Sequence, residues 1–330
     1  MRLHLRIAGT GRYLPEERIT NEFFEGLEKL FRYDASDNIT EVFEGKRRIT
    51  KEKIFEITGI RERRRTSLGD LPSDLGYRAA CDAIEKSGVK ADSIVGIIFN
   101  TLTEKRNIPS AACKIQKKLG IRNCFAYDIN NACAGFPEAI GQANSRVLRR
   151  EGNYLVVAAE CLTSIVDYTD INSTLFGDGA GAAVLTPTEE ERGILAEYSV
   201  SNPFENKVNF IFLNSKGVLR MPYGKEVMKN AVREMLESAR WLKKELDWER
   251  ADVYIPHQAN GRIIDAIKKR ISEEGSVVYN NIARYGNMSA ATCAIALDEA
   301  LEDGTIQAGK KVIITSFGAG LVTAAVAVEF

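Results

Sequence analysis

Short apolar runs alternate with longer helical patterns along most of this chain. Runs of strand length lie at residues 94–99 (IVGIIF), 124–129, 154–159, 180–185, 253–255, 312–315 and 321–328. Helical patterns lie at residues 74–87, 110–119, 134–150, 226–246, 259–271 and 290–301. Strands that alternate with helices of roughly 10–20 residues are typical of βαβ units. We therefore predict an α/β fold with central, largely parallel sheets.

The chain also uses one plan twice. A glycine-rich strand near residues 177–185 ends the early part, and a similar strand near residues 318–328 ends the later part. We predict an N-terminal half at residues 1–187 and a C-terminal half at residues 188–330. Residues 32–53 of the first half are polar and mixed in charge. We expect them to form an insertion with one short helix that is free to act as a mobile flap.

Charge and hydropathy exclude several classes of protein. Lysine plus arginine (45) equals aspartate plus glutamate (45), so the net charge offers no general attraction to nucleic acid or to a membrane surface. No apolar run approaches the roughly 18–20 residues of a membrane span. The first run is broken by His4 and Arg6, which is typical of a strand rather than of a signal peptide. We expect a cytoplasmic protein.

Cys133 has an unusual setting among the six cysteines. None of the six lies in a C-x-x-C pair or near a histidine at metal-ligand spacing, so we expect no metal site and mostly buried, reduced thiols. Cys133 lies in DINNACAGFPEAI, between an apolar run and a helical pattern. A helix N-terminus lowers the pKa of a thiol, and its free N–H groups can hold an oxyanion. The alternative is a buried cysteine at a tight strand–helix junction.

A histidine and an asparagine are further candidates. His257 follows an apolar run and Pro256, and a helical pattern begins soon after it. Such junctions at the carboxyl end of a sheet are where α/β sites usually form, although a lone histidine can equally be structural. Asn287 lies in RYGNMSAATCAIAL, where it can serve a site or simply form a turn. Ser289 is expected to cap the helix that follows.

Two glycine-rich runs have different interpretations. FGDGAGAA at residues 176–183 lacks the spacing of phosphate-binding and dinucleotide-binding motifs. It is better explained as a tight turn into a close-packed strand. SFGAG at residues 316–320 lies between two apolar runs and can present a backbone N–H group to a site.

Eight segments, in this order, resemble β-ketoacyl-[acyl-carrier-protein] synthase III, a condensing-enzyme branch of the thiolase superfamily. They are GTGRYLPEERITN (9–21), TGIRERR (58–64), IPSAACKIQKKLGI (108–121), NACAGF (131–136), LFGDGAGAAVL (175–185), PHQANGRII (256–264), GNMSAAT (286–292) and FGAG (317–320). His257 and Asn287 are also 30 residues apart (287 − 257), as in the family pattern. The resemblance implies a thiolase fold, in which two similar βαβ halves form an α-β-α-β-α five-layered sandwich, usually in a homodimer.

The resemblance also implies a reaction. Cys133 would be the nucleophile that takes an acyl group from a primer thioester, with the backbone N–H groups of Cys133 and Ala319 as its oxyanion hole. His257 and Asn287 would donate hydrogen bonds to a malonyl thioester while carbon dioxide departs. The resulting carbanion would attack the acyl group on Cys133, and Phe317 would match the gate at the malonyl site. No metal or redox cofactor is needed.

The implied partner is an acyl carrier protein in fatty acid or related lipid or polyketide biosynthesis. Asn260 matches a position near the pantetheine arm. Arg262, Lys268 and Lys269 would form a basic patch for the acidic carrier. The alternative is an ordinary solvated helix face.

Departures from the family pattern cluster on the coenzyme A site. Lys53 stands where the family carries a tryptophan for the adenine, Ile57 replaces a nearby arginine, and residues 170–172 lack a second arginine. We infer that the chemistry is kept and that primer delivery is altered. Ile108 and Met288 are candidates for shaping the pocket.

Three hypotheses remain open from sequence. The first is a decarboxylating condensing enzyme. The second is an acyltransferase or thioester hydrolase that uses the same Cys133, His257 and Asn287 without condensation. The third is a non-catalytic scaffold that binds a carrier protein, against which the intact set of three residues argues.

Overall fold

Two five-stranded sheets form the centre of the protein. The computed structural model describes residues 3–203, 210–271 and 273–330. The first sheet contains β1 (His4–Tyr13), β6 (Ile94–Asn100), β7 (Phe125–Ile129), β8 (Asn153–Cys161) and β9 (Asp178–Thr188), in the order β1-β9-β8-β6-β7. The second contains β10 (Gly193–Ser201), β13 (Val253–Pro256), β14 (Val277–Val278), β15 (Lys311–Gly318) and β16 (Val322–Glu329), in the order β10-β16-β15-β13-β14.

The two sheets share one topology, as the duplicated plan predicted. In each sheet the first strand along the chain pairs with the fifth, the fifth with the fourth, the fourth with the second, and the second with the third. The expectation of largely parallel sheets was wrong, because in each sheet the pairings of the fifth strand with the first and fourth strands are antiparallel. The fourth and fifth strands have no crossover helix between them, and a parallel pair would need one. The exact division at residues 187 and 188 stays a prediction.

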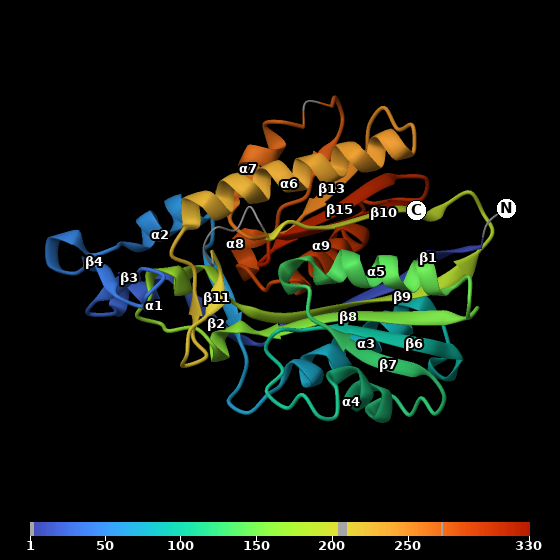
Figure 1. The fold of residues 1–330 in the computed structure, drawn as a ribbon, viewed down its shortest axis with the longest axis horizontal. Helices are drawn as coiled ribbons and strands as arrows, with labels where there is room; N and C mark the ends of the chain where they lie inside the picture. Colours follow the sequence, from blue (N-terminus) through green and yellow to red (C-terminus); the bar gives the residue numbers. More distant parts are fainter. Residues whose placement is uncertain (1–2, 204–209, 272) are drawn as a thin grey trace.

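Helices form three layers around these sheets. Figure 1 shows α3 (Pro72–Ser87) and α4 (Ala111–Lys118) outside the first sheet, and α6 (Gly224–Glu245) and α7 (Gly261–Lys268) outside the second. Between the sheets lie α5 (Gly135–Arg146) and α9 (Ala291–Glu302). The result is the expected α-β-α-β-α sandwich. None of the described helices is both long and apolar enough to cross a membrane.

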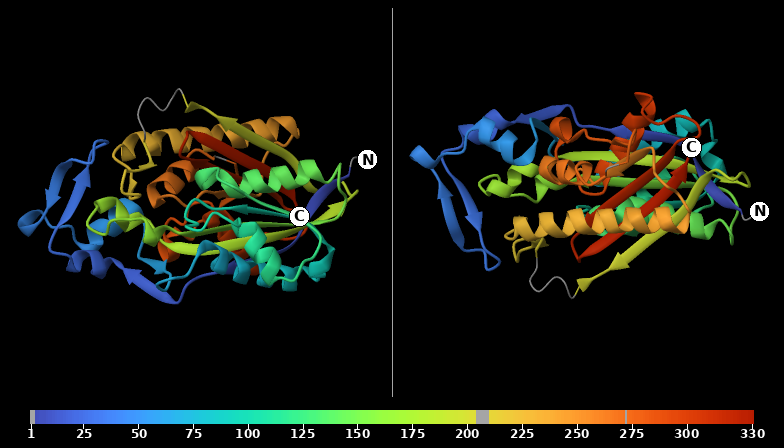
Figure 2. Two further views of the ribbon diagram at one scale, coloured as in Figure 1. Left: turned by 60° about the horizontal axis from the view of Figure 1, so that its bottom comes forward. Right: turned by 90° about the horizontal axis from the view of Figure 1, so that it is seen from above.

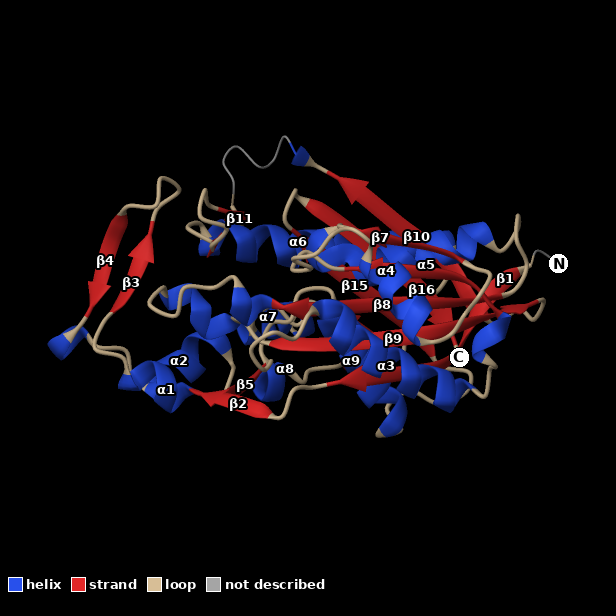
Figure 3. Ribbon diagram, turned by 90° about the horizontal axis from the view of Figure 1, so that it is seen from below, coloured by secondary structure: helices blue, strands red, loops and turns tan. Residues whose placement is uncertain are grey.

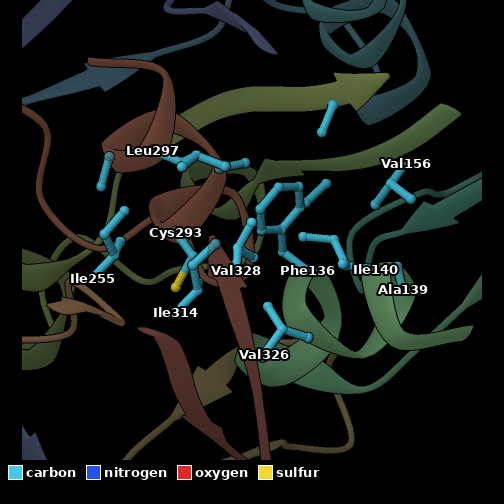
Figure 4. Close-up of a cluster of buried hydrophobic side chains, with 14 of the residues drawn as sticks. Phe136, Ala139, Ile140, Val156, Ile255, Cys293, Leu297, Ile314, Val326 and Val328 are labelled. Carbon is cyan, nitrogen blue, oxygen red and sulfur yellow. The ribbon is translucent and has the colours of Figure 1, made fainter. Parts of the chain in front are cut away.

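The central layer explains why α9 is apolar on nearly every face. Every residue of α9 from Ala291 to Ala300 is buried, because the helix contacts both sheets. Figure 4 shows Cys293 and Leu297 of α9 with Phe136 and Ile140 of α5 and strand residues of both sheets. Burying each large apolar side chain of this kind contributes about 1.5–3 kcal/mol to stability. This packing fixes the two halves against each other and so fixes the loops at their shared end.

Smaller elements gather at one end of the sandwich. They are β2 (Glu17–Thr20), α1 (Asn21–Gly26), β3 (Leu30–Tyr33), β4 (Ile39–Phe43), α2 (Lys51–Thr58), β5 (Glu62–Arg65), β11 (Phe212–Leu213), β12 (Leu219–Arg220) and α8 (Ile282–Tyr285). In Figures 2 and 3 the β3–β4 hairpin projects beyond the sheets at the end opposite the two termini.

The insertion at residues 32–53 contains one short helical turn, η1 (Gly45–Arg47), as expected, but much of it forms this hairpin, which the sequence analysis did not predict. Asp34 closes the turn, because its Oδ1 accepts from the backbone N–H groups of Ser36 and Asn38, each at 2.9 Å. The hairpin is also tied to the sandwich, because the Phe31 N–H donates to the Thr169 carbonyl at 2.7 Å. Arg220 Nε adds a 2.5 Å contact to Asp37. These ties argue against a free flap.

Candidate active site

Side chains from both halves line one cavity of about 980 Å³. It brings together Cys133, His257, Asn287, Phe317 and Ala319, although up to 186 positions (319 − 133) separate them in sequence. Much of the remaining wall is apolar, with Leu102, Leu162, Ile171, Leu175, Met221 and Val227 among its residues. A few polar groups in an apolar cavity are typical of a small-molecule site.

Cys133 lies in a single turn of 3-10 helix, η3 (Ala132–Ala134), between β7 and α5. Ala132 adopts a φ of 44°, which is uncommon for a residue with a side chain. Asn100, fully buried at the end of β6, holds this turn. Its Oδ1 accepts from the Asn131 N–H at 3.2 Å, and its Nδ2 donates to the Ala132 carbonyl at 3.3 Å. The turn therefore presents Cys133 at the start of α5, as predicted.

The second sheet holds the same turn from its other side. Ser316 in β15 is fully buried, and its hydroxyl donates to the Cys133 carbonyl at 2.6 Å. A Cβ added to Gly318 would lie 2.8 Å from the Cys133 nitrogen, so only glycine permits this approach. The Cys133 N–H group and the segment that carries Ala319 are therefore adjacent, as an oxyanion hole requires.

His257 follows β13 and is almost fully buried, with 3% of its surface exposed. Burial lowers the pKa of the imidazole to about 3, so the ring is neutral near pH 7. Its Nδ1 lies 2.7 Å from the Thr292 hydroxyl oxygen. The Thr292 hydroxyl also lies 2.8 Å from the Ser289 carbonyl, and its single proton can go to only one of these two acceptors. When that proton is donated to Nδ1, the remaining ring proton lies on Nε2, where it can donate to a ligand. The Ser289 carbonyl keeps a donor in this arrangement, because the Thr292 N–H lies 3.2 Å from it.

Asn287 is held through both backbone and side chain. Its N–H donates to the Leu175 carbonyl at 2.8 Å, and its carbonyl accepts from the Gly177 N–H at 2.9 Å. Its Oδ1 accepts from the Ser289 N–H at 2.8 Å, which leaves the Nδ2 amide protons to donate. The expected cap by Ser289 was wrong, because the N-cap of α9 is Ala290 and no side chain caps that helix.

The structure also corrects the expected pKa of Cys133. Burial raises the pKa of this thiol to about 11, while the Ser289 hydroxyl lowers it and Glu160 raises it further. Cys133 keeps some exposed surface. The favourable effect of the first turn of α5 on a thiolate is smaller than the cost of removing the sulfur from water. Burial also raises the pKa of Glu160 to about 8. Cys133 and His257 therefore both rest neutral, rather than as a thiolate–imidazolium pair.

The predicted carrier-binding residues are only partly brought together. Asn260 and Arg262 line the cavity at the start of α7. Asn260 also caps this helix, because its Oδ1 accepts from the Arg262 N–H at 2.8 Å. Lys268 and Lys269 are exposed at the other end of α7 and do not line the cavity. Six residues of helix separate Arg262 from Lys268 by about 9 Å.

The inserted hairpin forms one side of the cavity entrance. Arg32 of β3 and Glu41 of β4 line the cavity and are joined by a 3.1 Å hydrogen bond. Asp170, in the segment where the family pattern has an adenine-binding arginine, instead contacts Arg220 at 3.2 Å. The same Arg220 binds Asp37 of the hairpin, so the insertion and this segment form one unit. Ile108 and Met288 do not line the cavity of the single chain, although sequence suggested both.

Four supporting residues were not predicted from sequence in the roles they have here. Asn100 and Ser316 hold the Cys133 turn, and Thr292 contacts the His257 ring. Ser289 was expected as a cap but fixes the Asn287 amide through its backbone. Their only sequence signal is closeness to a motif. The contacts of Asn100, Ser316 and Thr292 join segments that are distant in sequence, and the local contact of Ser289 depends on its unusual backbone conformation.

A cavity of this kind at the end of a duplicated five-layered sandwich places the chain among thiolase-fold enzymes that transfer acyl groups. Comparison with known families agrees. Residues 127–203 match the model of 3-oxoacyl-[acyl-carrier-protein] synthase III, and residues 242–330 match the model of its C-terminal part.

Relatives and solved structures extend this match over the whole chain. The β-ketoacyl-[acyl-carrier-protein] synthase III of Xanthomonas axonopodis pv. citri is 38% identical and aligns over 97% of this chain and 96% of its own. That of Caldanaerobacter subterraneus is 36% identical over 98% and 97%. The crystal structure of the Aquifex aeolicus synthase III matches with a TM-score of 0.88, at 34% identity, over 99% of this chain and 100% of its own. The chain belongs to the β-ketoacyl-[acyl-carrier-protein] synthase III family.

Proposed function

We propose that this enzyme condenses an acyl thioester primer with malonyl-acyl-carrier-protein, losing carbon dioxide, in fatty acid or related biosynthesis. The observation that carries the proposal is the convergence of Cys133, His257 and Asn287 on one cavity from different loops. Cysteine supplies a nucleophile, and two neutral donors supply stabilisation for an enolate. A hydrolase would need neither the second thioester nor the two donors that face it.

In the first step the Cys133 sulfur attacks the primer carbonyl. The S–C bond to Cys133 forms, the bond to the carrier sulfur breaks, and the proton of Cys133 leaves on the carrier thiol. The N–H groups of Cys133 and Ala319 stabilise the tetrahedral oxyanion. The close approach of Gly318 to the Cys133 turn supports this role.

In the second step a malonyl thioester binds, with Phe317 as the gate to its part of the cavity. His257 donates from Nε2 and Asn287 from Nδ2 to the thioester oxygen, and the enolate forms as carbon dioxide departs. The carbanion attacks the acyl group, the bond to the Cys133 sulfur breaks, and the thiolate takes a proton from solvent. The low pKa of His257 supports this step, because a neutral ring does not protonate the carbanion.

We propose an acyl carrier protein as the macromolecular partner. Asn260 and Arg262 at the entrance would meet the pantetheine arm, and Lys268 and Lys269 would meet acidic carrier residues further along α7. The residues assigned to the reaction supply its nucleophile and donors, so we propose that it needs neither metal nor cofactor. A cytoplasmic location is part of the same proposal.

We also propose a homodimer. Among the described residues β7 pairs only with β6, so one edge of this strand has no neighbouring strand. All five residues of β7 are only partly buried in the single chain, including Phe125 and Tyr127. A second copy that pairs at this edge would extend the sheet and cover these rings. Light scattering should give twice the mass of one chain, and the mass of a single chain would contradict the dimer.

The test of function is intact-protein mass spectrometry after exposure to acyl thioesters of coenzyme A and of carrier protein. An acyl adduct on the wild type that is missing in Cys133→Ala would support the nucleophile. The adduct would also name the chain length and the carrier of the primer. If neither carrier loads the protein, the proposed function fails and the scaffold hypothesis returns.

A further inference from the structure

One polar group at the site has no use in the chemistry described so far. The Ser289 hydroxyl is buried, with 2% of the residue exposed, and has no hydrogen-bond partner among the described residues. Buried hydroxyls without partners are rare in folded proteins, because losing water without a replacement is costly. Ser289 also lines the cavity that contains Cys133. The other buried atoms without partners, on Arg64, Tyr168 and Thr186, belong to residues that do not line it.

The backbone around Ser289 explains how this hydroxyl is held. Ser289 adopts a φ of 51°, in the left-handed region that residues with side chains rarely enter. Its N–H donates to Asn287 Oδ1 at 2.8 Å, and its carbonyl lies 2.8 Å from the Thr292 hydroxyl. Both backbone groups are therefore engaged with neighbours of the reaction centre. The side chain is left facing the cavity, at a helix start that it does not cap.

We propose that the Ser289 hydroxyl donates a hydrogen bond to the Cys133 sulfur as that sulfur becomes a thiolate. The proposal builds on Cys133 as the nucleophile of the proposed function. A neutral thiol is a weak acceptor, which explains why the hydroxyl lacks a partner in the resting site. A charged sulfur is a strong acceptor, so the hydrogen bond becomes favourable once the thiolate forms. Ser289 keeps its proton throughout, so the balance of the acyl transfer is unchanged.

A second observation supports the direction of this effect. Burial is the main influence on Cys133 and raises its pKa, whereas a side-chain hydrogen bond from Ser289 to the ionised sulfur lowers it. Ser289 therefore opposes the largest obstacle to ionisation of the nucleophile. The helix N-terminus does not overcome that obstacle, and a local donor at this position reduces it.

The test uses two variants that both remove the hydroxyl, Ser289→Ala and Ser289→Gly. Glycine tolerates the positive φ and alanine does not, so an effect of backbone strain would separate the two variants. The rate of Cys133 alkylation by iodoacetamide is followed across pH by mass spectrometry of the Cys133 peptide. We expect both variants to react about tenfold more slowly at each pH below the midpoint, equivalent to one unit of pKa. Ser73→Ala is the matched control, because Ser73 is buried in α3 away from the cavity.

Unchanged alkylation rates in both Ser289 variants would overturn the proposal. Slower alkylation in Ser289→Ala alone would also overturn it, because backbone strain rather than the hydroxyl would then be the cause. If wild-type Cys133 takes no acyl group but alkylation still slows, the inference about Ser289 stands and the proposed function fails.

Discussion

The contact between Thr292 and His257 is the most informative place to perturb the site. Replacing Thr292 by valine keeps the branched shape and removes one hydroxyl. That hydroxyl lies 2.7 Å from His257 Nδ1, and all of Thr292 is buried. Without it, nothing on α9 selects the tautomer that has its proton on Nε2. His257 would then often present a lone pair, rather than a donor, to the malonyl thioester.

The size of the effect follows from the cost of one buried group left without its partner. That cost is about 1–3 kcal/mol. With 1.36 kcal/mol for each tenfold change in rate, decarboxylation should slow by about 5- to 160-fold. Acyl transfer to Cys133 should change little, because the oxyanion hole of that step uses backbone groups.

The assay measures both half-reactions on one preparation. Carbon dioxide release from malonyl-carrier-protein reports the second step, and intact mass reports acylation of Cys133 in the first. Thr292→Ser keeps the hydroxyl and should retain most of the activity, while thermal unfolding checks that each variant is folded. Wild-type decarboxylation in a folded Thr292→Val variant would refute the assignment of His257 as a donor held by Thr292.

Three further changes test other parts of the site. Gly135→Ala would place a Cβ 1.8 Å from Asn100 Oδ1, so we expect a loss of about 1–3 kcal/mol in unfolding free energy and slower acylation of Cys133. Denaturant unfolding measures the first effect and intact mass the second, and wild-type values of both would contradict the role of Asn100. The pKa of His257 is lowered from 6.5 to about 3, so between these pH values the unfolded chain binds a proton that the native chain does not. As the pH is lowered through that window, the unfolding free energy of the wild type should therefore decrease relative to that of His257→Gln. A constant difference between the two proteins would argue against a buried neutral ring. Arg220→Ala should free the β3–β4 hairpin, seen as faster amide exchange at residues 30–43 with α9 unaffected; unchanged exchange would show that Phe31 alone holds it.

The sequence predicted the duplicated fold because burial leaves a readable pattern. The apolar runs at residues 94–99 and 154–159 fell on β6 and β8, and the glycine-rich runs fell on β9 and on the end of β15. The relative direction of neighbouring strands was harder to predict, because a buried apolar run has the same sequence pattern beside a parallel or an antiparallel neighbour. The hairpin at β3–β4 was missed, although the Asp34 turn and the β-branched ITEVF run gave a usable signal.

Motifs in the sequence were enough to select the residues that we assign to the reaction, but not to predict their electrostatics. Cys133 was correctly expected at a helix start, but its pKa depends on burial by segments that are distant in sequence. Ser289 shows the same limit, because a serine before a helix is usually a cap and only the folded backbone turns it toward the cavity. Lys268 was grouped with Arg262 by proximity in sequence, yet the helix carries it away from the entrance.

The fate of an acyl group on Cys133 is the most direct test of the proposed condensation. Enzyme loaded with the acyl primer is mixed with malonyl-carrier-protein, and the adduct, the carbon dioxide and the thioester product are followed together. We expect the adduct to disappear in step with one equivalent each of carbon dioxide and 3-oxoacyl-carrier-protein, and no reaction in Cys133→Ala. Loss of the adduct as free acid, without carbon dioxide, would contradict condensation and identify a hydrolase.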